Sequence, residues 1–223
     1  MNLSSDKKLL INLGCGLNSP RNWLNCDSSL HAQLAKHPFV HSIVKRFDLL
    51  NKSSQWSANV EYINLNRPLP WATDTVDVVY SSHVLEHLKK SSAVLLLKES
   101  LRVLKPGGTL RIVVPDMFYH AKKYADNAEQ GQAALADFLY TINLCYPEDR
   151  NIIKRVYNHL MGFPSVHKTM YDHEKLKGLL EGTGFAGIAK QGYGISSYIS
   201  NISEIEGTSG YEGSLYLEAK KPS

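Results

Sequence analysis

The chain has 223 residues, of which 43% are hydrophobic and 21% charged, a balance that suits one globular domain with an ordinary buried core. Its net charge of +4 comes from scattered basic pairs rather than a stripe interleaved with aromatics, which argues against nucleic acid as a partner. No apolar run is long enough for a membrane span or a signal peptide, and the three cysteines lack metal-ligand spacing. We therefore expect a cytoplasmic protein with reduced cysteines and no membrane partner.

Short apolar runs, most of them ended by a turn or a polar residue, predict the strands of a buried sheet. In chain order they are 9–13, 23–26, 60–63, 76–80, 110–114, 185–191 and 214–219. The stretch 29–50 is expected to be helical in pieces broken near Pro38, and the Gly/Ser-rich stretch 192–213 to be a long loop.

Two helices are expected among these strands. Apolar residues recurring at 3-4-3 spacing predict a helix over 91–104, which Pro106-Gly107-Gly108 should stop with a left-handed glycine cap. Asp172 is expected to cap the start of a second helix, and Gly182 and Gly184 to end it.

The alternation of strands and helices places the chain in the α/β class, as a doubly wound, mostly parallel seven-stranded sheet covered on both faces. Residues 117–165 are rich in Ala, Lys, Tyr and Leu and interrupt this alternation. They predict a helical insertion after the fifth strand, lying over the carboxyl edge of the sheet.

Two groups at the ends of the first two strands are typical of a nucleoside site. Gly14-Cys15-Gly16 follows the first strand and lets a ligand approach the backbone, although a plain tight turn has the same pattern. Asp27 ends the second strand, where a carboxylate accepts hydrogen bonds from ribose hydroxyls or caps a helix that starts at Ser28.

The spacing argues against a nicotinamide dinucleotide. Asp27 lies 11 residues after Gly16, whereas a dinucleotide-binding fingerprint places its acidic residue about 20 residues on. Ser19 stands where that fingerprint has its third glycine. The short segment between Gly16 and Trp23 leaves no room for the usual crossover helix, so we expect that helix to be missing or reduced.

Ten short segments, taken together in chain order, resemble the motifs of class I S-adenosylmethionine-dependent methyltransferases of type 11. They are most similar to a subgroup associated with sugar and polysaccharide biosynthesis. The matching segments are Leu10–Gly16, Asn22–Asp27, Leu69–Trp71, Val76–Val79, Ser82–Leu88, Arg102–Leu110, Val114–Asp116, His167–Tyr171, Leu179–Leu180 and Gly184–Phe185. The resemblance implies a single methyltransferase domain over 1–223, with 117–165 as an insertion or cap within it.

The resemblance also implies which residues hold S-adenosylmethionine. Gly14, Cys15 and Gly16 would cradle its methionine part and Asp27 its ribose. The remaining implied positions are Asn64 and Leu65 beside the adenine, Ser81, Ser82 and His83 beside the sulfonium and methyl, and Asn12 where many members have an acidic residue.

The reaction this predicts is methyl transfer to a small-molecule or sugar-like acceptor, at oxygen, with a histidine as general base. His83 is the first candidate, and His167 and Tyr171 are expected to face the acceptor pocket. His87 is expected to be a structural hydrogen bonder. The offsets of His83, Glu86 and His87 do not fit a zinc-protease motif, so no metal is expected.

Two other hypotheses stay open. Asn12 departs from the family pattern, which motivates a non-catalytic protein of the same fold that binds S-adenosylmethionine or a partner. A nucleotide-dependent oxidoreductase is the third reading, and binding of NADH distinguishes it.

Overall fold

The seven strands form one sheet, as the sequence predicts, in the order β3-β2-β1-β4-β5-β7-β6. The structure, a computed structural model, describes residues 8–29, 57, 59–130, 135, 138–139, 167–207 and 212–223. The strands are β1 (Leu10–Leu13), β2 (Leu24–Asp27), β3 (Val60–Tyr62), β4 (Val76–Ser82), β5 (Leu104–Pro115), β6 (Ala186–Gln191) and β7 (Ser214–Lys220). β7 is antiparallel to β5 and β6, while the pairs from β3 to β5 are parallel.

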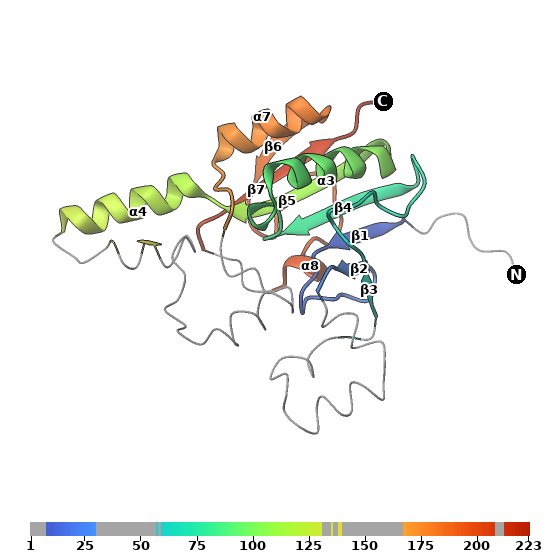
Figure 1. Cartoon of the computed structure of the whole chain (residues 1–223), viewed down its shortest axis with the longest axis horizontal. Helices are drawn as coiled ribbons and strands as arrows, with labels where there is room; N and C mark the ends of the chain where they lie inside the picture. The colour runs from blue at the N-terminus through green and yellow to red at the C-terminus, as the bar shows by residue number, and fades with distance from the viewer. Residues whose placement is uncertain are drawn as a thin grey trace, which may run out of the picture.

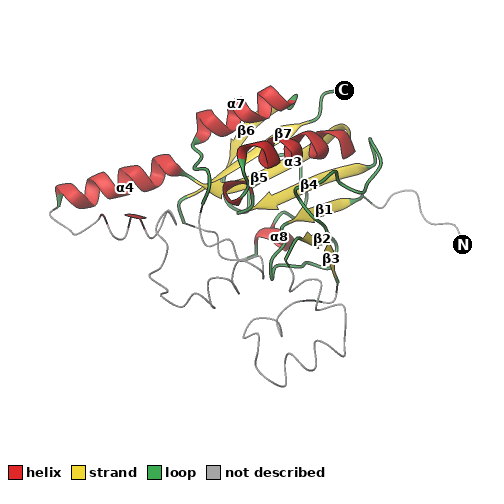
Figure 2. Ribbon diagram, viewed as in Figure 1, coloured by secondary structure: helices red, strands yellow, loops and turns green. Residues whose placement is uncertain are grey.

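One face of the sheet is covered by α3 (Lys90–Val103) and α7 (His173–Thr183), which lie on the same side of the strands (Figures 1 and 2). Leu97 of α3 and Leu176 of α7 are fully buried in one cluster with residues of the central strands. The side chain of Asp172 accepts from Lys175 N, and Gly184 closes α7 at φ 101°, so these two predicted caps are confirmed. Gly182 lies within the helix, so its predicted place at the helix end is wrong.

The predicted stop of the earlier helix is wrong. α3 ends at Val103 because Leu104 is already extended and fully buried, paired with Val76 of β4. Pro106-Gly107-Gly108 therefore lies inside β5 rather than capping a helix. A register shift between Val76 and Val78 accommodates this bulged start, where proline cannot donate to the ladder.

The opposite face of the sheet has no long helix among the described residues. Residues 14–23 form turns between β1 and β2, as the short spacing predicts. Their neighbour is α8 (Ser203–Glu206), a short helix within the stretch predicted as loop. Asn18 Nδ2 donates to Ile205 O at 2.5 Å and Asn22 Nδ2 to Glu204 Oε2 at 2.9 Å, so this later segment packs where a crossover helix would lie.

A buried ion network fixes the α8 segment on the sheet. The side chain of Arg111 in β5 has no exposure and binds Glu206 through Nε and Nη2, at 2.6 and 2.9 Å. Its Nη1 lies 3.1 Å from Glu218 Oε1 of β7. The same guanidinium donates to the carbonyls of Ile195 and Gly192. All three nitrogens of the Arg111 side chain therefore bind residues of this segment or of β7.

α4 (Met117–Glu129) begins the predicted insertion. The side chain of Asp116 accepts from Phe118 N at 3.1 Å and caps the helix. Figure 1 shows α4 running outward from the end of β5, and His120 is its buried residue. Most of 131–166 lies outside the described residues, as does 30–50, so the insertion and the helical pieces near Pro38 stay predictions. In the described ranges, no helix is both long and apolar enough to cross a membrane.

Candidate active site

The glycine bend Gly14–Gly16 follows β1 and contacts both β2 and the residues after β4. Gly14 and Gly16 have φ of 72° and 54°, in the left-handed region that favours glycine. Gly14 N and Cys15 N both donate to Cys26 O of β2, at 2.8 and 3.0 Å. A Cβ atom on Gly14 would lie 2.2 Å from Val84 Cγ2, so the bend sits directly against the residues that follow β4.

We expect Gly14→Ala to lower the free energy of unfolding by about 2–4 kcal/mol, as the left-handed backbone and the crowding against Val84 add together. Gly16→Ala is the matched control, because the built Cβ meets nothing within 4 Å and only backbone strain of about 1–2 kcal/mol applies. Urea denaturation of both variants measures the difference. Equal losses would contradict the Val84 contact.

The carboxylate of Asp27 joins β2 to this bend. Its Oδ2 accepts from Gly16 N at 2.9 Å, and its Oδ1 accepts from Ser29 N at 2.8 Å. The two interpretations of Asp27 therefore coexist, because one oxygen supports a local turn and the other faces the glycine bend. The carboxyl ends of parallel neighbours meet at one sheet edge, which is why the sequence alone could place these groups together.

The structure explains why position 12 carries an amide where many of the proteins that this chain resembles carry an acidic residue. Asn12 is 2% exposed, and its Nδ2 donates to Asn18 O and to Asn25 Oδ1, both at 3.0 Å. Asn25 Nδ2 in turn donates to the carbonyls of Pro20 and Trp23. A carboxylate at position 12 has no donor for the Asn18 carbonyl, so this short helix-free crossover requires an amide.

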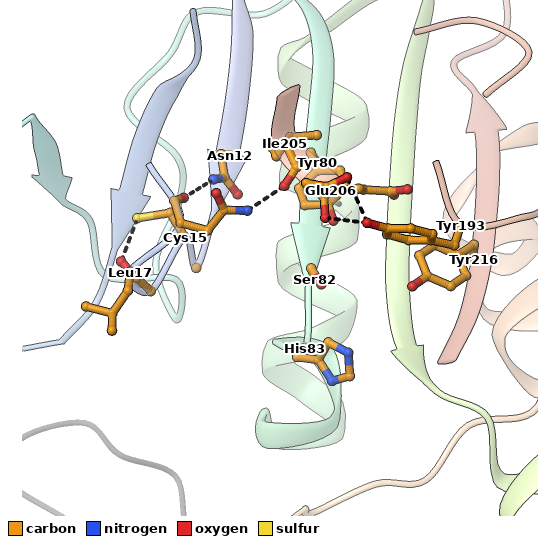
Figure 3. Close-up of a pocket in the computed structure, with 14 residues that line it drawn as sticks. Asn12, Cys15, Leu17, Tyr80, Ser82, His83, Tyr193, Ile205, Glu206 and Tyr216 are labelled. Carbon is orange, nitrogen blue, oxygen red and sulfur yellow. Dashed lines mark hydrogen bonds between the residues drawn. The ribbon is translucent and has the colours of Figure 1, made fainter. Parts of the chain in front are cut away.

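A cavity of about 680 Å³ opens beside the bend, on the face of the sheet that α8 covers (Figure 3). Its lining consists of Asn12, Gly14, Cys15, Gly16, Leu17, Asn18, Tyr80, Ser82, His83, Tyr193, Ile205, Glu206, Gly207 and Tyr216. Six of these were predicted cofactor residues: Asn12, Gly14, Cys15, Gly16, Ser82 and His83. Burial raises the pKa of the Cys15 thiol, so this side chain stays protonated and is not a nucleophile.

Four of the remaining predicted residues do not line this cavity. Ser81 is 1% exposed and points to the α3 side of β4, because strand side chains alternate and its neighbours Tyr80 and Ser82 take the cavity side. Leu65 is 3% exposed and packs in the main core. Asn64 Oδ1 accepts from Asn66 N in the turn after β3, and Asp27 Oδ2 accepts from Gly16 N. The cofactor contacts of these four residues stay predictions.

The predicted place of Tyr171 is corrected. It is 2% exposed within the main core, and Met117 N donates to its carbonyl at 2.8 Å. Burial, and then the negative charge of Glu86, raise the pKa of its phenol to about 12. A buried neutral phenol at this position does not face the cavity and does not serve as a base near neutral pH.

His83 is held in a strained conformation at the cavity rim. Its φ is 54°, unusual for a residue with a side chain, and its N–H donates to Val113 O at 2.9 Å. Nδ1 lies 3.2 Å from Glu86 Oε1, and Nε2 lies 3.3 Å from Ser214 Oγ. Figure 3 shows the ring just beyond Ser82, at the open end of the labelled cluster. His83 thus faces a buried carboxylate on one side and a hydroxyl on the other.

His167 lies elsewhere, next to His87. Their ring centroids are 4.8 Å apart, and Lys168 N and Thr169 N donate to Glu86 O at 2.7 and 3.1 Å. This pairing ties the residues after the insertion to the short 3-10 helix η2 (Leu85–His87). His167 is thus not among the residues that line the cavity.

The aromatic half of the cavity was missed. Tyr80, Tyr193 and Tyr216 line it opposite the glycine bend, with Glu206 and Gly207 from α8 and the residue after it (Figure 3). The period-two alternation of 214–219 puts Tyr216 on one face of a strand. No local signal in 192–213 indicates that this stretch folds back onto the sheet.

Residues 11–112 match the family described as a methyltransferase domain. No curated protein matches the chain. This match gives residues 11–112 as part of a methyltransferase domain, and its cofactor is S-adenosylmethionine. The protein is a methyltransferase.

Solved structures with a similar fold include an S-adenosylmethionine-dependent methyltransferase from Archaeoglobus fulgidus, at 15% identity and TM-score 0.48, covering 96% of this chain and 86% of that one. A possible histamine N-methyltransferase from Thermotoga maritima has 14% identity and TM-score 0.47, covering 96% and 82%. A methyltransferase of Haloferax volcanii, in complex with its Trm112 activator, has 15% identity and TM-score 0.46, covering 97% and 84%.

Proposed function

We propose that this methyltransferase acts on a hydroxyl group of a small, sugar-like acceptor, with His83 as the general base. The placement of His83 carries the proposal: its ring lies at the rim of the cavity, with Nδ1 beside the Glu86 carboxylate and Nε2 beside a hydroxyl. Proton removal matters most when the nucleophile is a hydroxyl, and histidine suits that task near neutral pH. The sugar-like class rests on the resemblance of the motif series to its subgroup.

The cavity supports binding of a cationic ligand. Bound S-adenosylmethionine supplies a methyl activated by a sulfonium, so the protein mainly aligns it with the acceptor. Three tyrosines line the cavity, and aromatic rings attract cations. Below them, two buried carboxylates, Glu206 and Glu218, face the single guanidinium of Arg111.

We propose the following roles for the residues around the bend. Gly14 to Gly16 hold the methionine part through close backbone approach, and Ser82 with His83 borders the methyl. Asp27, joined to Gly16 N at 2.9 Å, binds the ribose. Asn64 borders the adenine from the turn after β3. The hydroxyl of Ser214, beside His83 Nε2, lies where it can orient an acceptor or the base.

Asp27→Ala is expected to weaken S-adenosylmethionine binding by more than about tenfold, because charge-assisted hydrogen bonds to the ribose are lost. Isothermal calorimetry measures the affinity. Asp172→Ala is the matched control, since that aspartate also accepts a backbone N–H, from Lys175 at 2.8 Å, but caps a helix on the other face of the sheet. Affinity that is unchanged in Asp27→Ala would leave Asp27 as a turn residue only.

The proposed function is tested in two stages. Calorimetry with S-adenosylmethionine and S-adenosylhomocysteine should show binding. No heat of binding at millimolar ligand would contradict S-adenosylmethionine as the cofactor. Transfer of a labelled methyl group is then measured to free sugars, sugar nucleotides and matched amines. Labelling of amines with none of the sugars would contradict an oxygen acceptor.

A non-catalytic protein that keeps the cofactor is the second candidate. The observation that favours it is Asn12, whose Nδ2 donates to Asn18 O and Asn25 Oδ1. Product formed with any acceptor excludes this candidate.

A further inference from the structure

Glu86 of η2 is a fully buried carboxylate in need of positive charge. Its exposure is 0%, and among the described residues neither of its oxygens accepts a hydrogen bond. The nitrogens near Oε1 are His83 Nδ1 at 3.2 Å and His87 Nε2 at 3.9 Å. Burying a carboxylate away from water is strongly disfavoured unless a cation or a metal ion compensates it.

The fold brings a third histidine, His167, to this carboxylate from a distant part of the sequence. Two backbone hydrogen bonds, from Lys168 N and Thr169 N to Glu86 O, hold the segment that starts at His167 along η2. One potential ligand atom each from Glu86, His87 and His167 then lies within 4.8 Å of the others. The sequence offsets of His83, Glu86 and His87 could not indicate this trio, because one of its members follows the insertion.

We propose that Glu86, His87 and His167 bind one Zn²⁺ ion. Two imidazoles and a carboxylate are a ligand set that zinc takes in proteins, and three protein ligands leave a fourth position for water or another ligand. Tetrahedral coordination at about 2.0–2.1 Å puts ligand atoms about 3.4 Å apart, so no pair of the trio, all within 4.8 Å, closes by more than about 1.4 Å. Rotation of histidine side chains supplies a movement of that size.

The ion would fix the segment 167–171 against η2 and hold the carboxylate that faces His83. Other groups around Glu86 are His83 and Tyr171, whose phenol senses the carboxylate charge. The competing explanation is a protonated histidine as the partner of Glu86, without any metal. Metal binding distinguishes the two explanations directly, and it is independent of the acceptor and of S-adenosylmethionine.

The experiment uses the full chain, purified without a histidine tag, stripped with a chelator and titrated with Co²⁺ and then Zn²⁺. We expect the visible absorption bands of tetrahedral Co²⁺ at one equivalent, their displacement by Zn²⁺, and a higher thermal midpoint with Zn²⁺. Glu86→Gln and His167→Ala should each lower the affinity for the metal by at least about tenfold. His173→Ala is the control, because His173 forms an exposed contact with Glu174 at 2.8 Å, a pair of the same residue types at the surface.

Two outcomes overturn the proposal. A folded, unmodified chain that binds neither Co²⁺ nor Zn²⁺ in one-to-one ratio has no such site, and this titration needs no variant to fold. Binding that persists unchanged in both Glu86→Gln and His167→Ala, checked for folding by circular dichroism, places the metal elsewhere. Cofactor calorimetry on the same samples reports separately on the proposed methyl transfer, so failure of one does not imply failure of the other.

Discussion

His83→Ala is expected to lower turnover by about 10²–10⁴-fold, the range for loss of a general base, while S-adenosylmethionine affinity stays near normal. The expectation follows from the position of the ring, between Glu86 Oε1 and Ser214 Oγ at the cavity rim. Single-turnover transfer of a labelled methyl group, at saturating cofactor, measures the chemical step. Calorimetry on the same variant measures cofactor binding.

The backbone of His83 requires a second variant. Its φ of 54° strains alanine, whereas asparagine enters the left-handed region more readily. His83→Asn therefore removes the base and keeps the local conformation, and we expect it to be as inactive as His83→Ala. His173→Ala, an exposed histidine, should retain full turnover. An active His83→Asn variant would show that the base lies elsewhere or that none is needed.

Arg111→Met is expected to lower the free energy of unfolding by about 3–5 kcal/mol, because it leaves two buried carboxylates without their cation. The side chains of Glu206 and Glu218 are 2% and 0% exposed, and Arg111 itself has no exposure. Loss of the guanidinium also releases the carbonyls of Gly192 and Ile195. The α8 segment should detach first, so amide hydrogen exchange in 192–206 should accelerate more than in the main core.

Two matched variants separate the charge effect from general damage. Arg102→Met removes the partner of Glu99, at 2.7 Å, and a donor to the carbonyls of Leu69 and Trp71. Because the Arg102 side chain is 33% exposed, a smaller loss of about 1–2 kcal/mol is expected. The triple variant Arg111→Met, Glu206→Gln, Glu218→Gln removes the charges together and should recover part of the loss. Urea denaturation of each variant gives the free energies. A loss in Arg111→Met no larger than in Arg102→Met would contradict the buried network as the anchor of α8.

The contact between Asp27 and the glycine bend could be predicted from sequence because it depends on local patterns. Short apolar runs predict the first two strands, and the turn residues show where each strand ends. Parallel neighbours end at one edge, so the carboxylate and the bend had to lie near each other, and Asp27 Oδ2 does accept from Gly16 N. The missing crossover helix followed in the same way from the few residues between Gly16 and Trp23. The caps of α7 at Asp172 and Gly184 are equally local.

Tertiary contacts decided which residues line the cavity opposite the glycine bend and which residues surround Glu86. Tyr193 and Glu206 reach the cavity because Arg111 anchors their segment from β5, and His167 reaches Glu86 because backbone hydrogen bonds align it with η2. Ser81 was assigned to the site by its position in a motif, whereas the alternation of β4 turned its side chain to the other face. Local periodicity encodes which side of an element is buried and where it ends. It does not encode which distant segment covers that side, because that choice depends on packing and charge pairing across the whole chain.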